Sequence, residues 1–283
     1  MISLPSTRFV RLARARRNVV AAWNQAGEQT QFYAKTIVSI GDAVTHYRVE
    51  LIRLIATMSL GTGALALIGG TVVVVGFLTL SAGALIAVQG YNSLSGIGVE
   101  ALTGFASAYI NVRLVAPLVS GIGLAATIGA SATAQLGAMR ISEEIDALEV
   151  MGIRSIAYLA STRVMAGILV VLPLYCVAVL MSFLAARLGT TVGYGQSTGV
   201  YDHYFNTFLN PTDLIWSFLQ AITMAIVVML VHTYYGFTAS GGPAGVGEAV
   251  GRAVRTSLIA AVFVTLFVSL AVYGQTGNFH LSG

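Results

Sequence analysis

The chain alternates between long apolar stretches and short polar ones. Charged residues are absent from residues 54–99, 114–139, 164–186, 214–247 and 256–283. Each stretch exceeds the roughly 20 apolar residues that a helix needs to cross a bilayer. The pattern predicts an all-α polytopic membrane protein with about five transmembrane helices, at residues 54–90, 109–139, 156–186, 213–238 and 253–273.

The first apolar stretch is too long for one simple crossing. A continuous helix over residues 54–90 would be about 55 Å long, whereas the hydrocarbon core is about 30 Å thick. We therefore expect a broken helix or a re-entrant piece followed by a crossing. The glycines that favour a break are Gly61, Gly63, Gly69, Gly70, Gly76 and Gly83. Polar loops are expected at residues 91–108 and 187–212.

The N-terminal part, residues 1–53, is predicted to be a cytoplasmic basic and interfacial segment. Residues 5–17 contain five arginines and no acidic residue, which is typical of a segment attracted to anionic lipid. Residues 32–55 have the pattern of an amphipathic helix in the membrane interface, and a solvated helix packed on a partner is the alternative. Its apolar face would consist of Ile37, Ile40, Val44, Tyr47, Leu51 and Ile55.

Composition and charge fit this topology. Only 9% of the 283 residues are charged, against about 25% in a typical soluble domain. If the N-terminus, the region around residues 140–154 and the link at 239–255 are cytoplasmic, that side holds twelve of the fifteen basic residues, and thirteen with Arg163 near the start of the third span. This asymmetry predicts a cytoplasmic N-terminus and an external C-terminus. Arg113 and Arg187 are the exceptions. Because the arginines are explained as topology signals, the charge of +4 gives no indication of nucleic-acid binding.

Small residues recur every four positions along the second predicted span. Such a ridge lets another helix approach closely, which is how membrane helices pack. The partner helix could belong to the same chain or to a second subunit across a dimer seam, and the sequence slightly favours the same chain. The ridge consists of Gly121, Ala125, Gly129, Thr133 and Gly137.

Residues 137–154, GAMRISEEIDALEVMGIR, form a charged island between two apolar stretches. We predict a helix at 142–152, with Ser142 as its N-cap and Gly152 as the left-handed residue that ends it. Its apolar face would consist of Ile141, Ile145, Leu148 and Gly152. Its acidic side chains would be repelled by an anionic leaflet. We therefore interpret it as a docking element for a basic groove on a partner protein, rather than as a helix that touches only lipid headgroups.

The island and its surroundings resemble a known family. GASATAQL before it, GAMRISEEIDALEVMGI itself, and Tyr158, Leu159 and Arg163 after it are similar to the MlaE/YrbE family of ABC-transporter permeases. The similarity covers roughly residues 50–275 and looks strongest to the YrbE permeases of actinobacterial Mce lipid-transport systems. The resemblance implies that residues 54–283 form a MlaE/YrbE-like permease domain in the cell (inner or plasma) membrane.

In that family the island is the coupling helix that docks into the ATPase subunit. By resemblance, ATP-driven movement would be transmitted by Glu143, Glu144, Asp146, Ala147, Leu148, Met151 and Gly152. The implied partners are a second YrbE-type permease in a heterodimer, two cytoplasmic ABC ATPase subunits and external MCE-domain lipid carriers. The chain departs from the family pattern at Gln135, where many members have Glu, and near Ser155 and Thr162, where many have proline. These departures fit a permease that works beside a paralogue.

No cofactor, metal or catalytic site is expected in this chain. A Walker A motif needs Gly-Lys before Ser or Thr, and the only lysine, Lys35, follows alanine. ATP and Mg would therefore bind the partner ATPase. The four histidines have no metal-ligand spacing. Among them, His232 lies inside a span and is expected to face protein or a cavity. Cys176 is expected to be a small core residue.

The spans carry few fixed charges, which suits an amphipathic cargo. We predict a permease subunit that moves lipids or fatty acids, with import as the expected direction. By resemblance, the lipid path lies between two permeases, and its candidate residues are Leu65, Leu78, Leu80 and Val88. One alternative is an intramembrane lipid-modifying enzyme with Ser197 of a G-x-S-x-G motif as nucleophile. Another is a secondary lipid carrier, which the scarcity of carboxylates in the spans disfavours.

Overall fold

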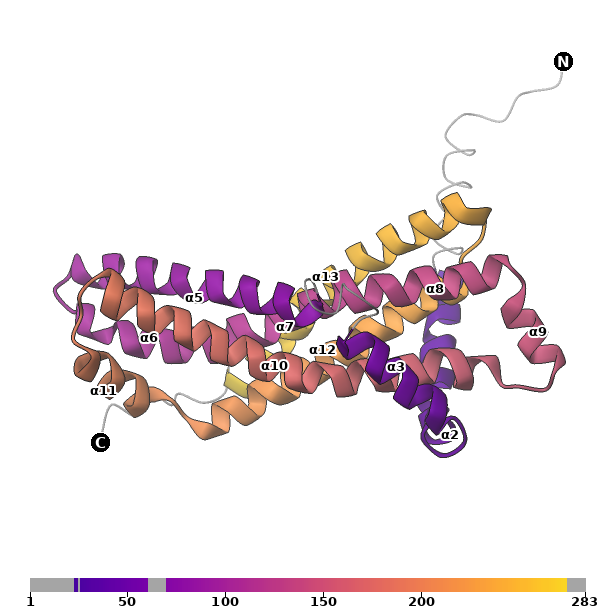
Figure 1. Ribbon diagram of the computed structural model, residues 1–283, viewed down its shortest axis with the longest axis horizontal. Coiled ribbons are helices and arrows are strands. Elements are labelled where there is room, and N and C mark those ends of the chain that lie inside the picture. Colours follow the sequence, from indigo (N-terminus) through magenta and orange to yellow (C-terminus); the bar gives the residue numbers. More distant parts are fainter. Residues whose placement is uncertain (1–22, 25, 61–69, 274–283) are drawn as a thin grey trace, which may run out of the picture.

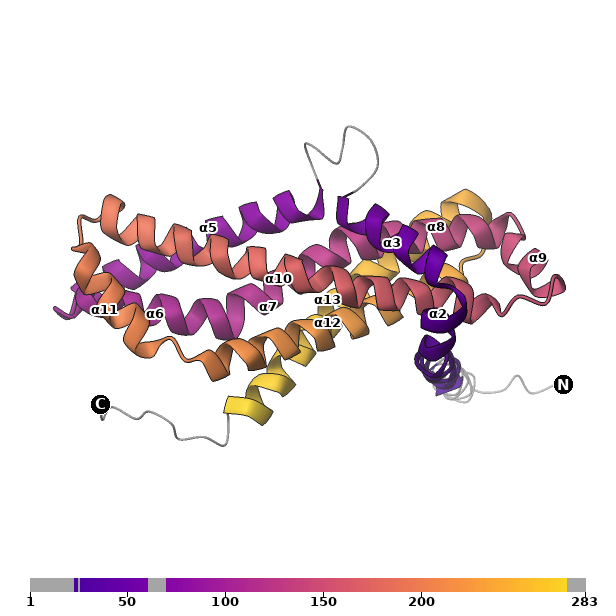
Figure 2. The same ribbon diagram turned by 60° about the horizontal axis from the view of Figure 1, so that its bottom comes forward.

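The computed structural model describes residues 23, 24, 26–60 and 70–273, which form an elongated helical bundle (Figures 1 and 2). The basic segment at 5–17, Leu65 and the glycines at 61, 63 and 69 lie outside the described residues. The described residues contain helices and no strand, so the all-α prediction is confirmed. Five helical runs are long and apolar enough to cross a membrane: Thr71–Ser95, Glu100–Ile141, Ile156–Gly193, Pro211–Phe237 and Gly242–Val272.

Several of these runs are composite. The second contains η1 (Glu100–Leu102), α6 (Thr103–Ile110), η2 (Asn111–Val115), α7 (Ala116–Leu124), η3 (Ala125–Gly129) and α8 (Ala130–Ile141). The third contains η4 (Ile156–Ser161), α10 (Thr162–Leu188) and η5 (Gly189–Gly193). Simple helices form the other runs: α5 (Thr71–Ser95), α12 (Pro211–Phe237) and α13 (Gly242–Tyr273). The segments η2 to η5 are π-helical.

The two predicted polar loops are wrong in large part, because both are mostly helical. The α5 helix continues to Ser95 and α6 begins at Thr103, while α11 (Thr198–Phe208) occupies the second loop. The two stretches pack on each other. The rings of Phe105 and Phe208 lie 4.7 Å apart, and the Tyr201 hydroxyl lies 2.9 Å from Ser107 Oγ. Aromatic and small polar side chains therefore pack two helical stretches together, although the polarity of both stretches had predicted loops.

The predicted continuous helix over residues 32–55 is also wrong. Residues 26–38 are helical, and α2 (Ile40–His46) and α3 (Arg48–Leu60) follow after breaks at Ser39 and Tyr47. The breaks redirect the chain, so Leu51 packs against α10 whereas Ile37 and Val44 stay exposed. The buried side chains of this region therefore do not follow a single helical stripe.

The α10 helix lies at the centre of the bundle and packs against α3, α5, α7 and α12. Its contact with α5 is close because a Cβ at Gly83 would lie 2.2 Å from the Ser182 carbonyl oxygen. Thr71, Val75, Thr79, Gly83 and Ala87 are the buried stripe of α5. Cys176, by contrast, is exposed on α10, so its expected place in the core is wrong.

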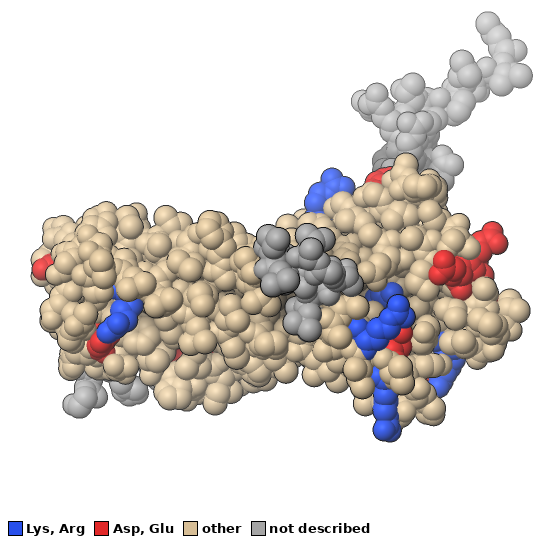
Figure 3. Space-filling view, in the orientation of Figure 1, with Lys and Arg blue, Asp and Glu red and all other residues tan. Residues whose placement is uncertain are grey.

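The two ends of the bundle differ in charge. In Figure 1, α2 and α9 (Glu144–Val150) lie at one end with the link between α12 and α13, and α11 lies at the other end beside the turn from α5 to α6. In Figure 3, most of the visible charged side chains gather over the half that carries α9, and acidic side chains project from its tip. The described parts of the three stretches that the charge count assigns to one side therefore lie at one end of the bundle.

Candidate functional site

The charged island forms the short helix α9, which begins later than predicted. Glu143 has φ of 61°, the only positive φ of a non-glycine residue in the described chain. Ser142 does not cap α9. Its hydroxyl donates to the Ala138 carbonyl oxygen at 3.0 Å, so it belongs to the C-terminus of α8. The left-handed Glu143 then turns the chain sharply, and α9 starts at Glu144.

The inner face of α9 is anchored by apolar packing. Ile145 is fully buried beside Leu136 of α8 and Leu159 of η4, and the partly buried Leu148 packs against the same cluster. Of the predicted apolar face, Ile145 and Leu148 are in this cluster, whereas Ile141 belongs to the end of α8 and Gly152 is exposed. Because α9 lies outside the five spans, its inner face is held by removal of apolar surface from water.

Three of the four acidic side chains have partners within the protein, and Glu144 Oε1 accepts from the nearby Ser142 hydroxyl at 2.9 Å. Arg140 Nη1 lies 2.5 Å from Asp146 Oδ1, and the Ser155 hydroxyl donates to Glu149 Oε1 at 2.5 Å. Glu143 and Glu144 are exposed, as is Ala147. All four acidic side chains are exposed, but Asp146 and Glu149 brace α9 against neighbouring elements, whereas Glu143 and Glu144 lie at its N-terminal end.

The C-terminal end of α9 has the predicted left-handed glycine. Gly152 has φ of 78°, and the Ile153 N–H donates to the Leu148 carbonyl oxygen at 3.0 Å. These features are those of a glycine-terminated helix. Immediately before it, Val150 and Met151 are 90% and 66% exposed, so the tip of α9 presents apolar side chains to solvent.

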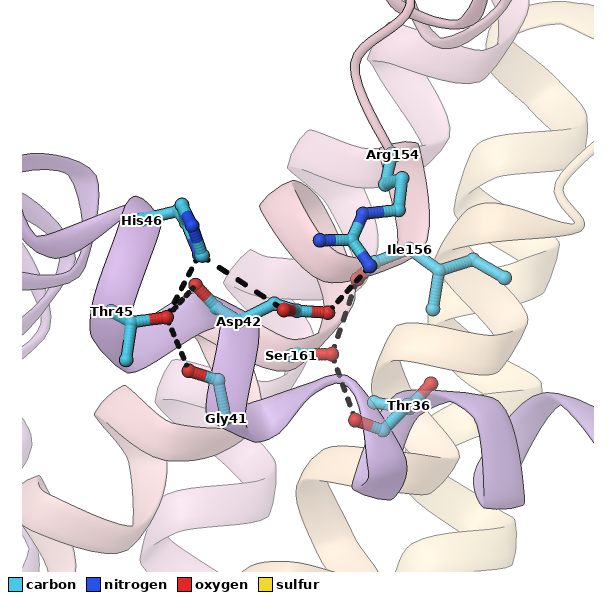
Figure 4. Close-up of polar contacts among 8 residues, drawn as sticks. All are labelled: Thr36, Gly41, Asp42, Thr45, His46, Arg154, Ile156 and Ser161. Atoms are coloured by element: carbon cyan, nitrogen blue, oxygen red, sulfur yellow. Dashed lines mark hydrogen bonds and ion pairs between the residues drawn. The ribbon is translucent and has the colours of Figure 1, made fainter.

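The connection that follows α9 is tied to the N-terminal helices (Figure 4). Arg154 Nη1 lies 2.7 Å from Asp42 Oδ2 of α2, and the buried Ser161 hydroxyl donates to the Thr36 carbonyl oxygen at 2.8 Å. A groove of about 470 Å³ lies between the two regions, with Lys35 on one wall and Arg154 on the other. The N-terminal helices therefore brace the base of α9 together with α8 and η4.

The predicted small-residue ridge packs inside the chain. A Cβ at Gly121 would lie 1.9 Å from Met224 Sδ, and one at Gly129 would lie 2.6 Å from His232 Cδ2, both on α12. Thr133 Oγ1 lies 2.8 Å from His232 Nδ1. A Cβ at Gly137 would meet Val246 of α13 at 2.9 Å, and Ala125 is fully buried. The small residues of the ridge therefore allow α7 and α8 to approach α12 and α13 closely.

The other predicted residues are dispersed. Leu78, Leu80 and Val88 lie on α5, off its buried stripe, and are about 40% exposed: 41%, 41% and 43%. Gln135 is exposed on α8, where its amide lies 3.2 Å from Ser131 Oγ. Ser155 and Thr162, where the family pattern has prolines nearby, are buried.

The hydrolase-like motif is not assembled as a triad. Ser197 precedes α11, and the described hydrogen bonds join Asp202 to Arg187 at 2.8 Å. These bonds lower the pKa of the Asp202 carboxyl. Among the described residues, no group of three His, Cys, Asp or Glu side chains is positioned to hold a metal ion.

One polar contact was not predictable from sequence. Arg113 of η2 donates to Asp213 at the start of α12, with Nη2 2.7 Å from Oδ2, across 100 positions of the chain. The Arg113 guanidinium also lies 4.1 Å from the centre of the Tyr109 ring. The only signal in the sequence was that Arg113 did not fit the charge asymmetry.

Comparison with known proteins decides the family. Residues 61–271 match the family described as Permease MlaE. The chain belongs to the MlaE permease family. A probable ABC transporter permease protein of Rickettsia bellii is 29% identical over 197 residues, which cover 66% of this chain and 72% of the relative. One from Rickettsia felis is 28% identical over 241 residues, 83% of this chain and 92% of the relative.

A plant protein is similar as well. Protein TRIGALACTOSYLDIACYLGLYCEROL 1, chloroplastic, of Arabidopsis thaliana is 28% identical over 190 residues, 66% of this chain and 53% of that protein. Together with the five apolar helical runs, membership of the family makes this chain a multi-pass membrane protein and the permease component of an ABC transporter. Such a permease works with ATPase partners.

Proposed function

We propose that this chain is the permease subunit of an ABC-type Mce lipid transporter, and that α9 is the helix through which a separate ATPase drives it. The observation that carries the proposal is the exposed outer side of α9, from Glu143 to Met151. It combines two outward acidic side chains, Glu143 and Glu144, with the exposed apolar pair Val150 and Met151. A partner groove with an apolar floor and a basic rim fits this surface.

The contacts at the base of α9 suit a helix that transmits force. Ile145 fixes it to α8 and η4, the Arg140–Asp146 ion pair fixes it to α8, and Glu149 fixes it to Ser155. A displacement of α9 is therefore passed to the ends of two membrane spans. Within the proposed coupling set, Glu143, Glu144, Ala147 and Met151 face the ATPase, whereas Asp146, Leu148 and Gly152 maintain the helix.

The lipid side of the proposal rests on apolar surface. The exposed face of α5 includes Leu78, Leu80 and Val88, which would line a lipid path against a second, paralogous permease. External MCE-domain proteins would supply the lipid or fatty acid at the end that carries α11, and transport would be import. The α9 end and the N-terminus would then be cytoplasmic and the C-terminus external, in the cell membrane.

A charge reversal on α9 tests this function. We expect Glu143→Lys with Glu144→Lys to leave membrane insertion intact, because both side chains are exposed, while reducing co-purification of the ATPase and ATP-dependent lipid uptake. Two lost charge contacts at an interface rim, at about 0.2–1 kcal/mol each, predict a decrease of roughly 2- to 30-fold in ATPase affinity at low salt. The readouts are quantitative pull-down from native membrane and uptake of radiolabelled fatty acid.

The matched control is Glu100→Lys, which reverses one charge on η1 near the opposite end of the bundle. It should leave ATPase association unchanged. If the double α9 variant retains both full ATPase association and full uptake, the coupling role of α9 is wrong. If the ATPase stays bound but uptake of fatty acid is absent even in the unaltered complex, the coupling role stands and the cargo assignment is wrong.

A further inference from the structure

A fully buried polar cluster joins three helices inside the spans. His232 of α12 has no exposed surface, and both of its ring nitrogens have partners on other helices. Nδ1 lies 2.8 Å from Thr133 Oγ1 of α8, and Nε2 lies 3.0 Å from Ser257 Oγ of α13. Thr133 and Ser257 are also fully buried. We call these three residues the His232 cluster.

The helices approach closely around the cluster. A Cβ at Gly129 would lie 2.6 Å from the imidazole, and one at Gly236 would lie 2.9 Å from the Thr133 carbonyl oxygen. Gly129 is also the last residue of the π-helical segment η3. The backbones of α8 and α12 are thus held together on both sides of the cluster. Small residues make this approach possible, and the histidine supplies the directional contact.

The hydrogen bonds of the cluster are complete in either neutral form of the ring. If Nδ1 carries the proton, it donates to Thr133, whose hydroxyl can donate to the His232 carbonyl oxygen at 3.0 Å, and Ser257 donates to Nε2. If Nε2 carries the proton, it donates to Ser257, whose hydroxyl can donate to the Val254 carbonyl oxygen at 3.0 Å, and Thr133 donates to Nδ1. A neutral imidazole offers one donor and one acceptor, so it suits two hydroxyl partners.

The cluster lies on the path from α9 to the least buried span. The α8 helix leads directly into α9, and Thr133 is on α8. Ser257 is on α13. In the most apolar part of this span only 22% of the residues are buried, whereas the share is 33–50% in the other four spans. The exposed apolar side chains of α13 include Val262 and Phe263. A polar contact buried in a span is costly and marks a functional position by default.

We propose that His232 is a positioning residue for ATP-driven transport. It joins α8 to α13, so a displacement that begins at α9 also moves the exposed face of α13. This inference rests on the proposed function, because it takes α9 as the point where the ATPase acts. Interhelical hydrogen bonds in membranes contribute on average about 0.6 kcal/mol each. We call the positions of α13 before and after this displacement its resting and displaced positions. Loss of both bonds therefore predicts a change of roughly 8-fold in the population ratio of the two positions.

The test measures the movement of α13 in the assembled transporter. In a Cys176→Ala background, which removes the only cysteine, spin labels are attached at Val262→Cys on α13 and Leu180→Cys on α10. Both positions are exposed, at 60% and 62%. Electron–electron double resonance gives the distance distribution without nucleotide and after trapping with ATP and vanadate. We expect nucleotide to shift the distribution in the otherwise unaltered complex.

His232→Leu should reduce the shifted fraction, whereas His232→Gln, which retains a donor and an acceptor, should keep most of it. Both variants must retain the ATPase. Thr133→Val and Ser257→Ala each remove one bond and should change the ratio about 3-fold. They also keep the test decisive if His232→Leu does not fold. The matched control is Thr223→Val, because the Thr223 hydroxyl bonds only within α12, to the Leu219 carbonyl oxygen.

Three results would overturn the inference. The first is a full shift in His232→Leu. The second is single-hydroxyl variants that behave like Thr223→Val. The third is no nucleotide-dependent shift in the otherwise unaltered complex although the ATPase is bound, since α13 then does not move. Failure of any ATPase to co-purify would instead overturn the proposed function, and this inference with it.

Discussion

Truncation of Ile145 separates the anchoring of α9 from its docking surface. Ile145 is fully buried between α8 and η4, whereas Val150, five residues later, is 90% exposed. Ile145→Ala should therefore loosen the helix without changing the side chains that face the ATPase. Val150→Ala shortens a side chain of the same class on the same helix and leaves the anchor intact.

The expected magnitude follows from the buried volume. Ile145→Ala removes three carbons from a site with no exposure, at about 0.8 kcal/mol per carbon. A residual cavity adds to this, and buried Ile→Ala changes cost roughly 2–5 kcal/mol. A loss of about 2.5 kcal/mol would raise the population of the undocked α9 roughly 60-fold. An exposed change such as Val150→Ala should stay within about 0.5 kcal/mol.

Hydrogen exchange of the permease in detergent measures this population. Peptides that cover residues 144–150 should exchange faster by about the predicted factor in Ile145→Ala, and at an unchanged rate in Val150→Ala. Peptides from the middle of α10 serve as an internal reference. Equal exchange of α9 in the two variants would refute the claim that Ile145 anchors the helix.

Three further outcomes follow from contacts elsewhere. Gly83→Ala should lower the thermal unfolding midpoint because its Cβ would meet a carbonyl oxygen at 2.2 Å, at a cost of about 1–3 kcal/mol, whereas Gly251→Ala, with nothing within 4 Å, should not. Asp213→Asn weakens a partly buried ion pair and should cost about 1.5–3 kcal/mol, against less than about 1 kcal/mol for the more exposed Asp202→Asn. Because its arginine partner lowers the pKa of Asp202, the carboxylate stabilises the fold above its unfolded pKa, and this stability is lost as pH falls through the lower folded value. Exchange protection of α11 should therefore stay constant from about pH 8 to 5 and decrease only below about pH 4. A decrease already near pH 6 would contradict this assignment.

Local pattern was sufficient for the spans and for most of the island. Charge-free stretches longer than a bilayer crossing correspond to the five helical runs, and Gly152 takes the left-handed conformation expected of a helix-ending glycine. The N-cap assignment failed because the Ser142 hydroxyl donates to the Ala138 carbonyl oxygen of α8 and to the Glu144 carboxylate, and to no backbone N–H of α9. The α9 helix starts only after the left-handed turn at Glu143, and glutamate carries no sequence signal for that conformation.

Contacts between distant segments were beyond the sequence. The α6–α11 contact depends on Ser107 meeting Tyr201 across the bundle, and neither residue alone distinguishes a helix from a polar loop. His232 could be recognised as a polar residue inside a span, but its partners are 99 positions before it and 25 after it. The partners of the acidic residues of α9 could not be predicted either, because they depend on which basic or hydroxyl group the fold brings near.

The docking of α9 to an ATPase is tested most directly by a photo-cross-link from the C-terminal tip of α9 in native membrane. A photoreactive amino acid replaces Met151, which is 66% exposed, and in a separate variant replaces Val192, which is 77% exposed on η5 toward the opposite end. Docking through α9 predicts a covalent adduct with an ABC ATPase from position 151 and none from position 192. An ATPase adduct from position 192, or adducts with lipid alone from position 151, would contradict it.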